Sequence, residues 1–152
     1  MSIFTVIILG ALCGLIGAFS MNLFMRSVSA SFSQRVDMIR ALGSYFTGTT
    51  EKANGLGTLI HAIAGILFGI LYFLIMHSMN ALVLPYALFL GIAFGFFHGL
   101  IMSYALMFYA SERHPIEEYR KATLEQGLLH LVGHIIYGAI VGLIGGLITL
   151  AL

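Results

Sequence analysis

Residues 126–146 read QGLLHLVGHIIYGAIVGLIGG, a stretch apolar enough to cross a bilayer that nevertheless carries Gln126, His130, His134 and Tyr137. At about 100° per residue these four side chains fall on one stripe of a helix, and glycines at intervals of four continue it. A polar stripe that leads into a glycine groove is suited to face other helices rather than lipid. Imidazoles inside a membrane are costly and tend to mark function, so their partners are the main question.

The composition is that of an integral membrane protein. Of the 152 residues, 60% are hydrophobic and 9% are charged, and the mean hydropathy is +1.02. Four stretches reach the roughly 20 apolar residues that a hydrocarbon core requires. We therefore predict one all-α integral membrane domain over residues 1–152, a bundle of four transmembrane helices at about 3–25, 55–76, 81–109 and 124–152.

The charged residues predict the topology. All seven Lys and Arg, and five of the six acidic residues, lie in the first and third connections between these helices. Because Lys and Arg are retained on the cytoplasmic side, we predict a multi-pass protein of the cytoplasmic (inner) membrane with both termini outside. The first helix lacks a basic segment before it and is expected to be retained rather than cleaved as a signal peptide. The net charge of +1 argues against a nucleic-acid partner, and the bilayer is the expected one.

Small residues recur every four positions in all four predicted helices. The patterns are Gly10-x3-Gly14-x3-Ala18, His61-x3-Gly65-x3-Gly69, Gly91-x3-Gly95-x3-Gly99 and His134-x3-Gly138-x3-Gly142. The first matches the third and the second matches the fourth, which indicates a duplicated helical hairpin with parallel copies. The alternative is chance similarity, because such ridges are common where membrane helices pack closely.

The first charged connection contains an amphipathic segment. Residues 34–46 read QRVDMIRALGSYF, in which Val36, Ile39, Leu42 and Phe46 recur at helical spacing. We predict a short interfacial helix on the inner membrane surface, capped by Ser33. The alternative is a disordered loop.

Four histidines are expected to converge. At 1.5 Å per residue, His61, His98, His130 and His134 lie roughly 9 to 16 Å from the charged ends of their helices, within about one helical turn of each other in depth. Neutral imidazole binds Zn, Cu and Fe, so these four are the predicted ligands of a transition-metal ion. For a haem b, His98 and His134 are the predicted axial pair, since neighbouring glycines leave space for the macrocycle. The alternative is that the histidines are interhelical hydrogen-bond partners.

The third connection, residues 111–126, reads SERHPIEEYRKATLEQ and lies near the same end. Its residues His114, Glu117, Glu118 and Glu125 could cover the site or supply carboxylate ligands; the simpler interpretation is a solvated charged turn. The single Cys13 excludes an internal disulfide. Because the sequence has no nucleophile elbow, phosphate loop or zincin motif, we do not expect an enzyme that acts on its own.

The segments His61-Ala-Ile-Ala-Gly65, Phe97-His98-Gly99, His114-Pro115 and Gly133-His134-Ile-Ile-Tyr137-Gly138 carry a resemblance. The chain resembles small four-helix bacterial and archaeal inner-membrane proteins of the uncharacterised YagU-like type. The resemblance covers most of the chain and implies a four-helix fold with shared histidines at positions 61, 98 and 134. It implies no activity.

Three functions follow from these patterns. The first is binding of a haem b or transition-metal centre through the intramembrane histidines, for electron transfer or metal handling. The second is a non-catalytic accessory subunit of a larger membrane complex, with the glycine ridges packing against partner helices. The third is a small transporter, which would require a homo-oligomer because four helices form a thin wall around a pathway.

Overall fold

The computed structural model describes residues 1–29 and 37–152, and within these two ranges every regular element is helical. The long helices are α1 (Ile3–Ser29), α3 (Ala53–Ser78), α4 (Tyr86–Tyr104) and α6 (Leu124–Ala151). The short ones are α2 (Met38–Thr47), the π-helical η1 (Ala105–Ala110), α5 (Ser111–Arg113) and the 3₁₀-helical η2 (Glu117–Tyr119). Four helices are long and apolar enough to span a membrane, with α4, η1 and α5 forming one of them. Within the described residues, the predicted all-helical class with four helices long and apolar enough to span a membrane is confirmed.

The third spanning helix begins later than the sequence suggested. It starts at Tyr86 rather than near residue 81, because the chain first turns at Asn80, which has a φ of +53°, and then passes through Pro85. Proline has no N–H to donate, so it fits directly before a helix and not in its interior.

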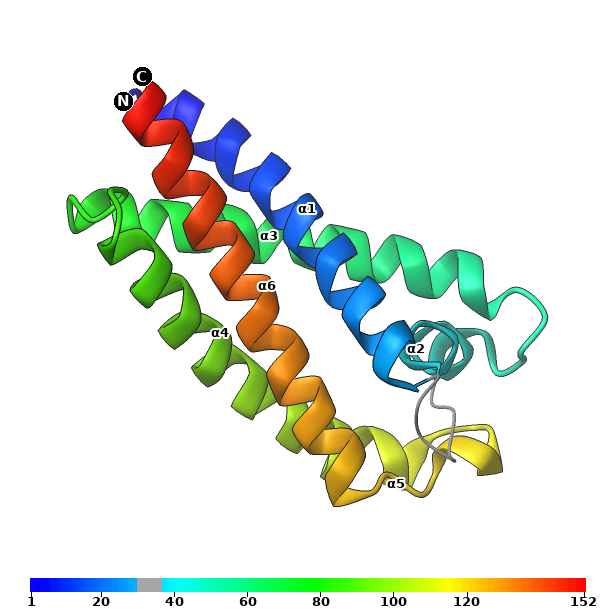
Figure 1. Ribbon diagram of the computed structural model, residues 1–152. Helices are drawn as coiled ribbons and strands as arrows, with labels where there is room; N and C mark the ends of the chain where they lie inside the picture. Colours follow the sequence, from blue (N-terminus) through cyan, green and yellow to red (C-terminus); the bar gives the residue numbers. More distant parts are fainter. Residues whose placement is uncertain (30–36) are drawn as a thin grey trace.

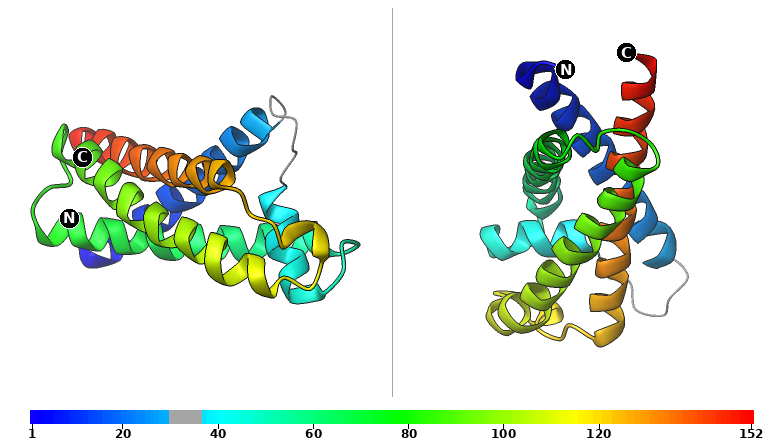
Figure 2. Two further views of the ribbon diagram at one scale, coloured as in Figure 1. Left: turned by 90° about the horizontal axis from the view of Figure 1, so that it is seen from below. Right: turned by 90° about the vertical axis from the view of Figure 1, so that its left-hand side faces the viewer.

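The long helices form two closely packed pairs. Helix α1 crosses α3, α4 lies along α6, and α1 and α6 join the two pairs (Figure 1). By contrast, the backbones of α3 and α4 diverge from the short connection between them, and the two helices meet mainly through side chains such as Phe68 and Tyr72 of α3. Figure 2 shows the same arrangement from two other sides. The candidate functional site lies where these two helices diverge.

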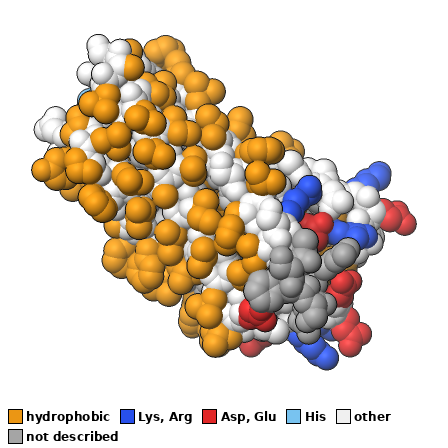
Figure 3. Space-filling view, in the orientation of Figure 1, with side chains coloured by type: hydrophobic (Ala, Val, Ile, Leu, Met, Phe, Trp, Pro, Cys, Tyr) orange, Lys and Arg blue, Asp and Glu red, His pale blue; other side chains and the backbone are white. Residues whose placement is uncertain are grey.

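The two ends of the molecule differ in chemistry. Both chain termini lie at one end, here called the termini end. The Lys, Arg, Asp and Glu side chains gather at the other, around α2 and α5, while the visible surface between is largely apolar (Figure 3). We call this other end the charged end.

Glycines bring the helices of each pair into backbone contact. In the first pair, a Cβ on Gly69 would lie 2.5 Å from Cα of Gly14, and in the second, a Cβ on Gly138 would lie 3.0 Å from Cα of Gly95. Neither distance leaves room for a side chain. The small-residue ridges therefore lie where the helices meet, which is how membrane helices pack without a hydrophobic driving force between them.

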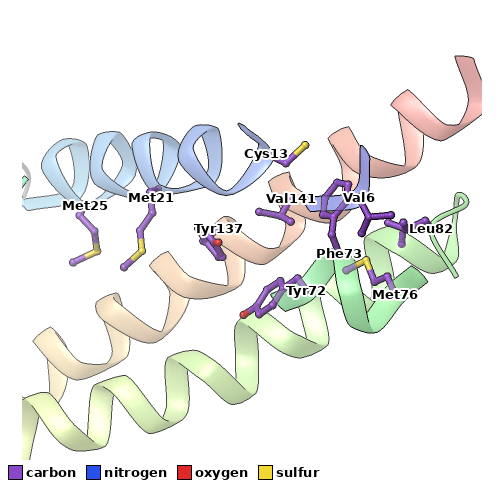
Figure 4. Packing of buried hydrophobic residues seen from close by; sticks show 12 residues of the cluster. Val6, Cys13, Met21, Met25, Tyr72, Phe73, Met76, Leu82, Tyr137 and Val141 are labelled. Carbon is purple, nitrogen blue, oxygen red and sulfur yellow. The ribbon is translucent and has the colours of Figure 1, made fainter. Parts of the chain in front are cut away.

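The termini end is filled by apolar side chains. Val6, Phe73, Met76 and Val141 are fully buried there, and Figure 4 shows them gathered between the helices. Their packing leaves this half of the bundle solid.

Helix α2 packs against the start of α3 through a backbone contact. A Cβ on Gly57 would lie 3.0 Å from the backbone nitrogen of Gly43, and Ile39 is buried beside them. Asp37 caps α2 by accepting a hydrogen bond from the backbone N–H of Arg40. The predicted Ser33 cap and Val36 lie outside the described residues, whereas Phe46 of the predicted apolar face is exposed. A short helix therefore lies in the first connection, and it is held by the Gly43–Gly57 contact together with the buried Ile39 and Ala41.

Candidate functional site

A cavity of about 720 Å³ occupies the half of the bundle toward the charged end. Helices α1, α2, α3, α4 with η1, and α6 all contribute to its wall. It extends from His134 and Tyr137 of α6 to Glu118 and Lys121 in the third connection. Cavities of roughly 300–1,000 Å³ are typical of small-molecule sites. This cavity is therefore large enough for far more than a single ion.

All four histidines predicted from the sequence line this cavity. The ring centroids of His98 and His134 are 4.6 Å apart, and those of His130 and His134 are 4.5 Å apart. The ring planes meet at 70° and 90°, so each pair is in edge-to-face contact. His61 reaches the same cavity from α3. The structure thus brings three of the rings into one contact chain centred on His134 and places the fourth on the same cavity wall.

Backbone carbonyls fix which ring nitrogen is protonated in two of these histidines. His134 Nδ1 is 2.9 Å from the carbonyl oxygen of His130, and His61 Nε2 is 3.2 Å from that of Ala18. A carbonyl can only accept, so these two nitrogens carry the protons. The lone pairs then lie on Nε2 of His134 and Nδ1 of His61. No described residue hydrogen-bonds to either of these two atoms.

His98 is held from two sides. Its Nδ1 lies 3.2 Å from the hydroxyl of Tyr72, and its ring stacks on Phe68 with centroids 3.7 Å apart. Tyr72 shares a face with His61 in the sequence, but its bond to His98 could not be predicted because it depends on how α3 and α4 are rotated. Phe68 lies one turn before Tyr72 and so shares its helix face. This spacing is the sequence signal that could have identified Phe68 as a residue of the site.

His130 completes the group with an unsatisfied atom. Its Nδ1 is buried and has no hydrogen-bond partner among the residues described. Buried polar atoms are usually paired, so an unpaired one within a histidine cluster calls for an explanation. A different ring orientation or a bound partner would satisfy it.

The remaining polar residues of the stripe have structural roles. The Tyr137 hydroxyl donates to the carbonyl oxygen of Gly65 at 2.7 Å, which ties α6 to α3 below the cavity. Gln126 forms a capping box with Thr123 at the start of α6. The spacing Thr-x-x-Gln is typical of such a capping box. It is the sequence signal that could have identified Gln126 as a capping residue.

In the third connection, His114 is a structural link. It is 4% exposed, donates from Nε2 to the carbonyl oxygen of Ala41 at 3.0 Å, and accepts at Nδ1 from the backbone N–H of Ile116. Burial raises the pKa of the nearby Tyr119 phenol, and the Glu118 carboxylate adds to this. His114 also borders the cavity, but both of its ring nitrogens are engaged in hydrogen bonds, so its role is to tie the third connection to α2.

The three acidic candidates of this connection are on the surface. Glu117, Glu118 and Glu125 are exposed, and of these only Glu118 borders the cavity. Across residues 1–29 and 37–152, no three His, Cys, Asp or Glu side chains are arranged as a metal-binding group. The histidine ligand set accordingly stays a prediction, and so does a carboxylate contribution.

Comparison with known proteins adds no assignment. No family model matches the chain. No curated protein and no solved structure matches it either. The resemblance to YagU-like membrane proteins stays a prediction, and the function has to be argued from the site.

Proposed function

We propose that the protein binds a transition-metal ion through His98, His130 and His134, with His61 as a fourth ligand, inside a membrane-embedded cavity. The observation that carries this proposal is the hydrogen bond from His134 Nδ1 to the carbonyl oxygen of His130. Metal-binding histidines commonly donate their second ring N–H to a backbone carbonyl, which orients the ring and leaves the other nitrogen for the metal. His134 has this arrangement and contacts two further imidazoles.

Binding would require a modest change in ring orientation. Metal–nitrogen bonds of about 2.0–2.1 Å bring two ligating nitrogens within about 3.5 Å of each other. Ring centroids at 4.5 and 4.6 Å are compatible with this spacing, but edge-to-face planes do not aim both nitrogens at one point. The unpaired Nδ1 of His130 favours a turn of that ring, and the adjoining cavity gives it space. Zn, Cu and Fe all suit such an imidazole site.

A haem b is the second form of this proposal. Axial imidazoles lie on opposite faces of the macrocycle, with nitrogens roughly 4 Å apart at about 2 Å per bond. His98 and His134 are in direct ring contact, so they would have to separate to admit the macrocycle. A single ion needs the smaller rearrangement, and we therefore prefer it.

We place the site on the cytoplasmic side of an inner membrane. Lys and Arg gather at the charged end, which supports that end as the cytoplasmic one and the termini end as the outer one. The metal would then enter from the cytoplasm, where the cavity borders Glu118 and Lys121.

We further propose that the chain arose from a duplicated hairpin. His61 bonds to Ala18 of the paired helix, and His134 lies against Gly99 of its own paired helix. These are matching positions in the two sequence patterns. The two cavity histidines would then be equivalent residues of the two copies.

Metal analysis of the purified protein tests the proposal. The full chain, purified from its native membrane in mild detergent, should contain one transition-metal ion per chain. His134→Ala should abolish binding, while His77→Ala, at the termini end of α3, should retain it. A Soret band with equimolar iron would establish haem instead. A metal-free wild-type protein that co-purifies with larger membrane proteins would refute the proposal and support an accessory subunit.

A further inference from the structure

The cavity opens sideways as well as toward the charged end. Phe46 of α2, Met102 of α4 and Tyr109 of η1 line it and are also 62%, 38% and 59% exposed. A residue that both lines a cavity and is exposed marks its rim. Because α3 and α4 diverge here and the helices lie in lipid, a molecule could enter from the bilayer.

The opposite end of the cavity is closed. Tyr137 and Gly65 are joined by a hydrogen bond at its inner limit. Beyond them lie the fully buried Phe73, Met76 and Val141. A ligand therefore has a fixed inner position for its head and an open rim for any tail.

The residues of the inner wall determine which kind of ligand head group the cavity can accommodate. The sequence has no Asp, Glu, Lys or Arg between residues 53 and 111 or after residue 125, so no formal side-chain charge lies at this depth. The polar groups there are imidazoles and tyrosine hydroxyls, and the aromatic rings of Phe68 and His98, stacked on each other, line the cavity. An ionic head would remain uncompensated in such a place, whereas a neutral planar head would be accommodated.

We infer that this cavity binds a membrane-soluble quinone or quinol, with its head among the imidazoles and its apolar tail leaving past Phe46, Met102 and Tyr109. This inference does not depend on the metal site, but His98 Nε2 can serve only one of the two ligands at a time, so the metal and the quinone would compete. It concerns binding only and includes no electron transfer.

The Tyr72–His98 pair can recognise both forms of such a ligand. When the Tyr72 hydroxyl donates to His98 Nδ1, Nε2 carries the proton and donates to a quinone carbonyl. When Nδ1 donates to the hydroxyl oxygen, Nε2 accepts from a quinol hydroxyl. The site adapts to either ligand when the ring proton of His98 moves between Nε2 and Nδ1 and the Tyr72 hydroxyl turns to donate or to accept accordingly, so Tyr72 acts as a positioning residue.

Native mass spectrometry of the full chain in mild detergent tests this inference, with an alkyl-substituted benzoquinone as the probe. We expect one quinone per chain in protein treated with chelator, and at least tenfold weaker binding in metal-loaded protein, in which His98 Nε2 is occupied by the metal. Ala64→Phe places a ring in the cavity and should weaken binding at least tenfold. Leu67→Phe, on the same helix but 61% exposed and outside the cavity, should change it less than twofold.

A second measurement keeps the test sound if Ala64→Phe fails to fold. Tyr72→Phe removes one oxygen and should weaken binding roughly three- to tenfold, as expected for one hydrogen bond. His98→Ala should return the infrared carbonyl stretch of the bound quinone toward its value in free solution. An unchanged stretch, equal binding by Ala64→Phe and Leu67→Phe, or displacement by a saturated fatty acid of equal length would overturn the inference. Loss of quinone binding on chelation alone would tie the ligand to the metal and also overturn it.

Discussion

Gly138→Ala should destabilise the bundle by separating α4 from α6. A Cβ at this position overlaps the carbonyl oxygen of Gly91 and lies 3.0 Å from Cα of Gly95. Both obstacles are backbone atoms of α4, so no side chain can turn aside. Since carbon atoms pack at about 3.5–4.0 Å, the two helices must move apart by roughly 1 Å.

The magnitude follows from two opposing terms. Inserting a methyl group into a closely packed contact costs about 1–3 kcal/mol. Replacing glycine by alanine in a helix is itself stabilising by about 0.5–1 kcal/mol. The same gain occurs at a glycine with open space around it, so a control substitution at such a glycine cancels it. Gly55, on α3, has nothing within 4 Å of an added Cβ and serves as the matched control. We expect Gly138→Ala to be about 2 kcal/mol less stable than Gly55→Ala.

Denaturant-induced unfolding in mild detergent, followed by circular dichroism, measures this difference. Because Gly138 lies one turn from His134, the same substitution should also lower metal occupancy. If Gly138→Ala proves as stable as Gly55→Ala, the helices do not meet through these glycines and the described packing is wrong.

Three further predictions concern single contacts. Tyr137→Phe removes the hydrogen bond to the Gly65 carbonyl and should cost about 1 kcal/mol in the same unfolding measurement. His114→Ala removes the donor to the Ala41 carbonyl and should cost about 1–3 kcal/mol, with faster amide hydrogen exchange in α2. The Tyr119 phenol, with its pKa raised above 10, should form phenolate later than free tyrosine in an alkaline absorbance titration. Because the folded form holds its proton more tightly, its stabilising contribution is complete below pH 10 and is lost as the pH rises through the folded pKa.

Each of these has a matched control. Tyr86→Phe alters a tyrosine that is 63% exposed and should leave stability unchanged. His77→Ala should not accelerate amide hydrogen exchange in α2, because His77 lies at the end of α3 that is remote from α2. In the titration, the difference between wild type and Tyr119→Phe isolates the one phenol. A Tyr119 titration with its midpoint at or below pH 10 contradicts the raised pKa.

Composition and spacing predicted the helical class because a bilayer constrains sequence strongly. Apolar length alone marks the four spans. The boundary near Tyr86 was missed because Ala81 to Leu84 are as apolar as the helix that follows, so hydropathy does not show where the chain turns. The tight fit of Gly43 on Gly57 was missed because only Gly57 continues a ridge, that of His61, Gly65 and Gly69, while its partner Gly43 belongs to none.

The site could be predicted only in part. Depth along a helix follows from residue counting, and it placed four histidines at similar depths. Which rings touch depends on helix rotation and on the divergence of α3 from α4, neither of which is encoded in spacing within one helix. The contacts of His98 with Phe68 and Tyr72 depend on this rotation and divergence, and so does the lateral rim of the cavity. The sequence therefore could not predict them.

The termini end is filled by buried apolar side chains, whereas the half toward the charged end contains the cavity. This difference limits where a ligand can bind. Phe73, Met76 and Val141 block the way onward from the histidines. The cavity borders Glu118 at the charged end and the exposed residues Phe46, Met102 and Tyr109 at its rim, and these are the places where a ligand could enter or leave. A ligand bound as proposed would therefore be held in the half of the bundle nearer the charged end.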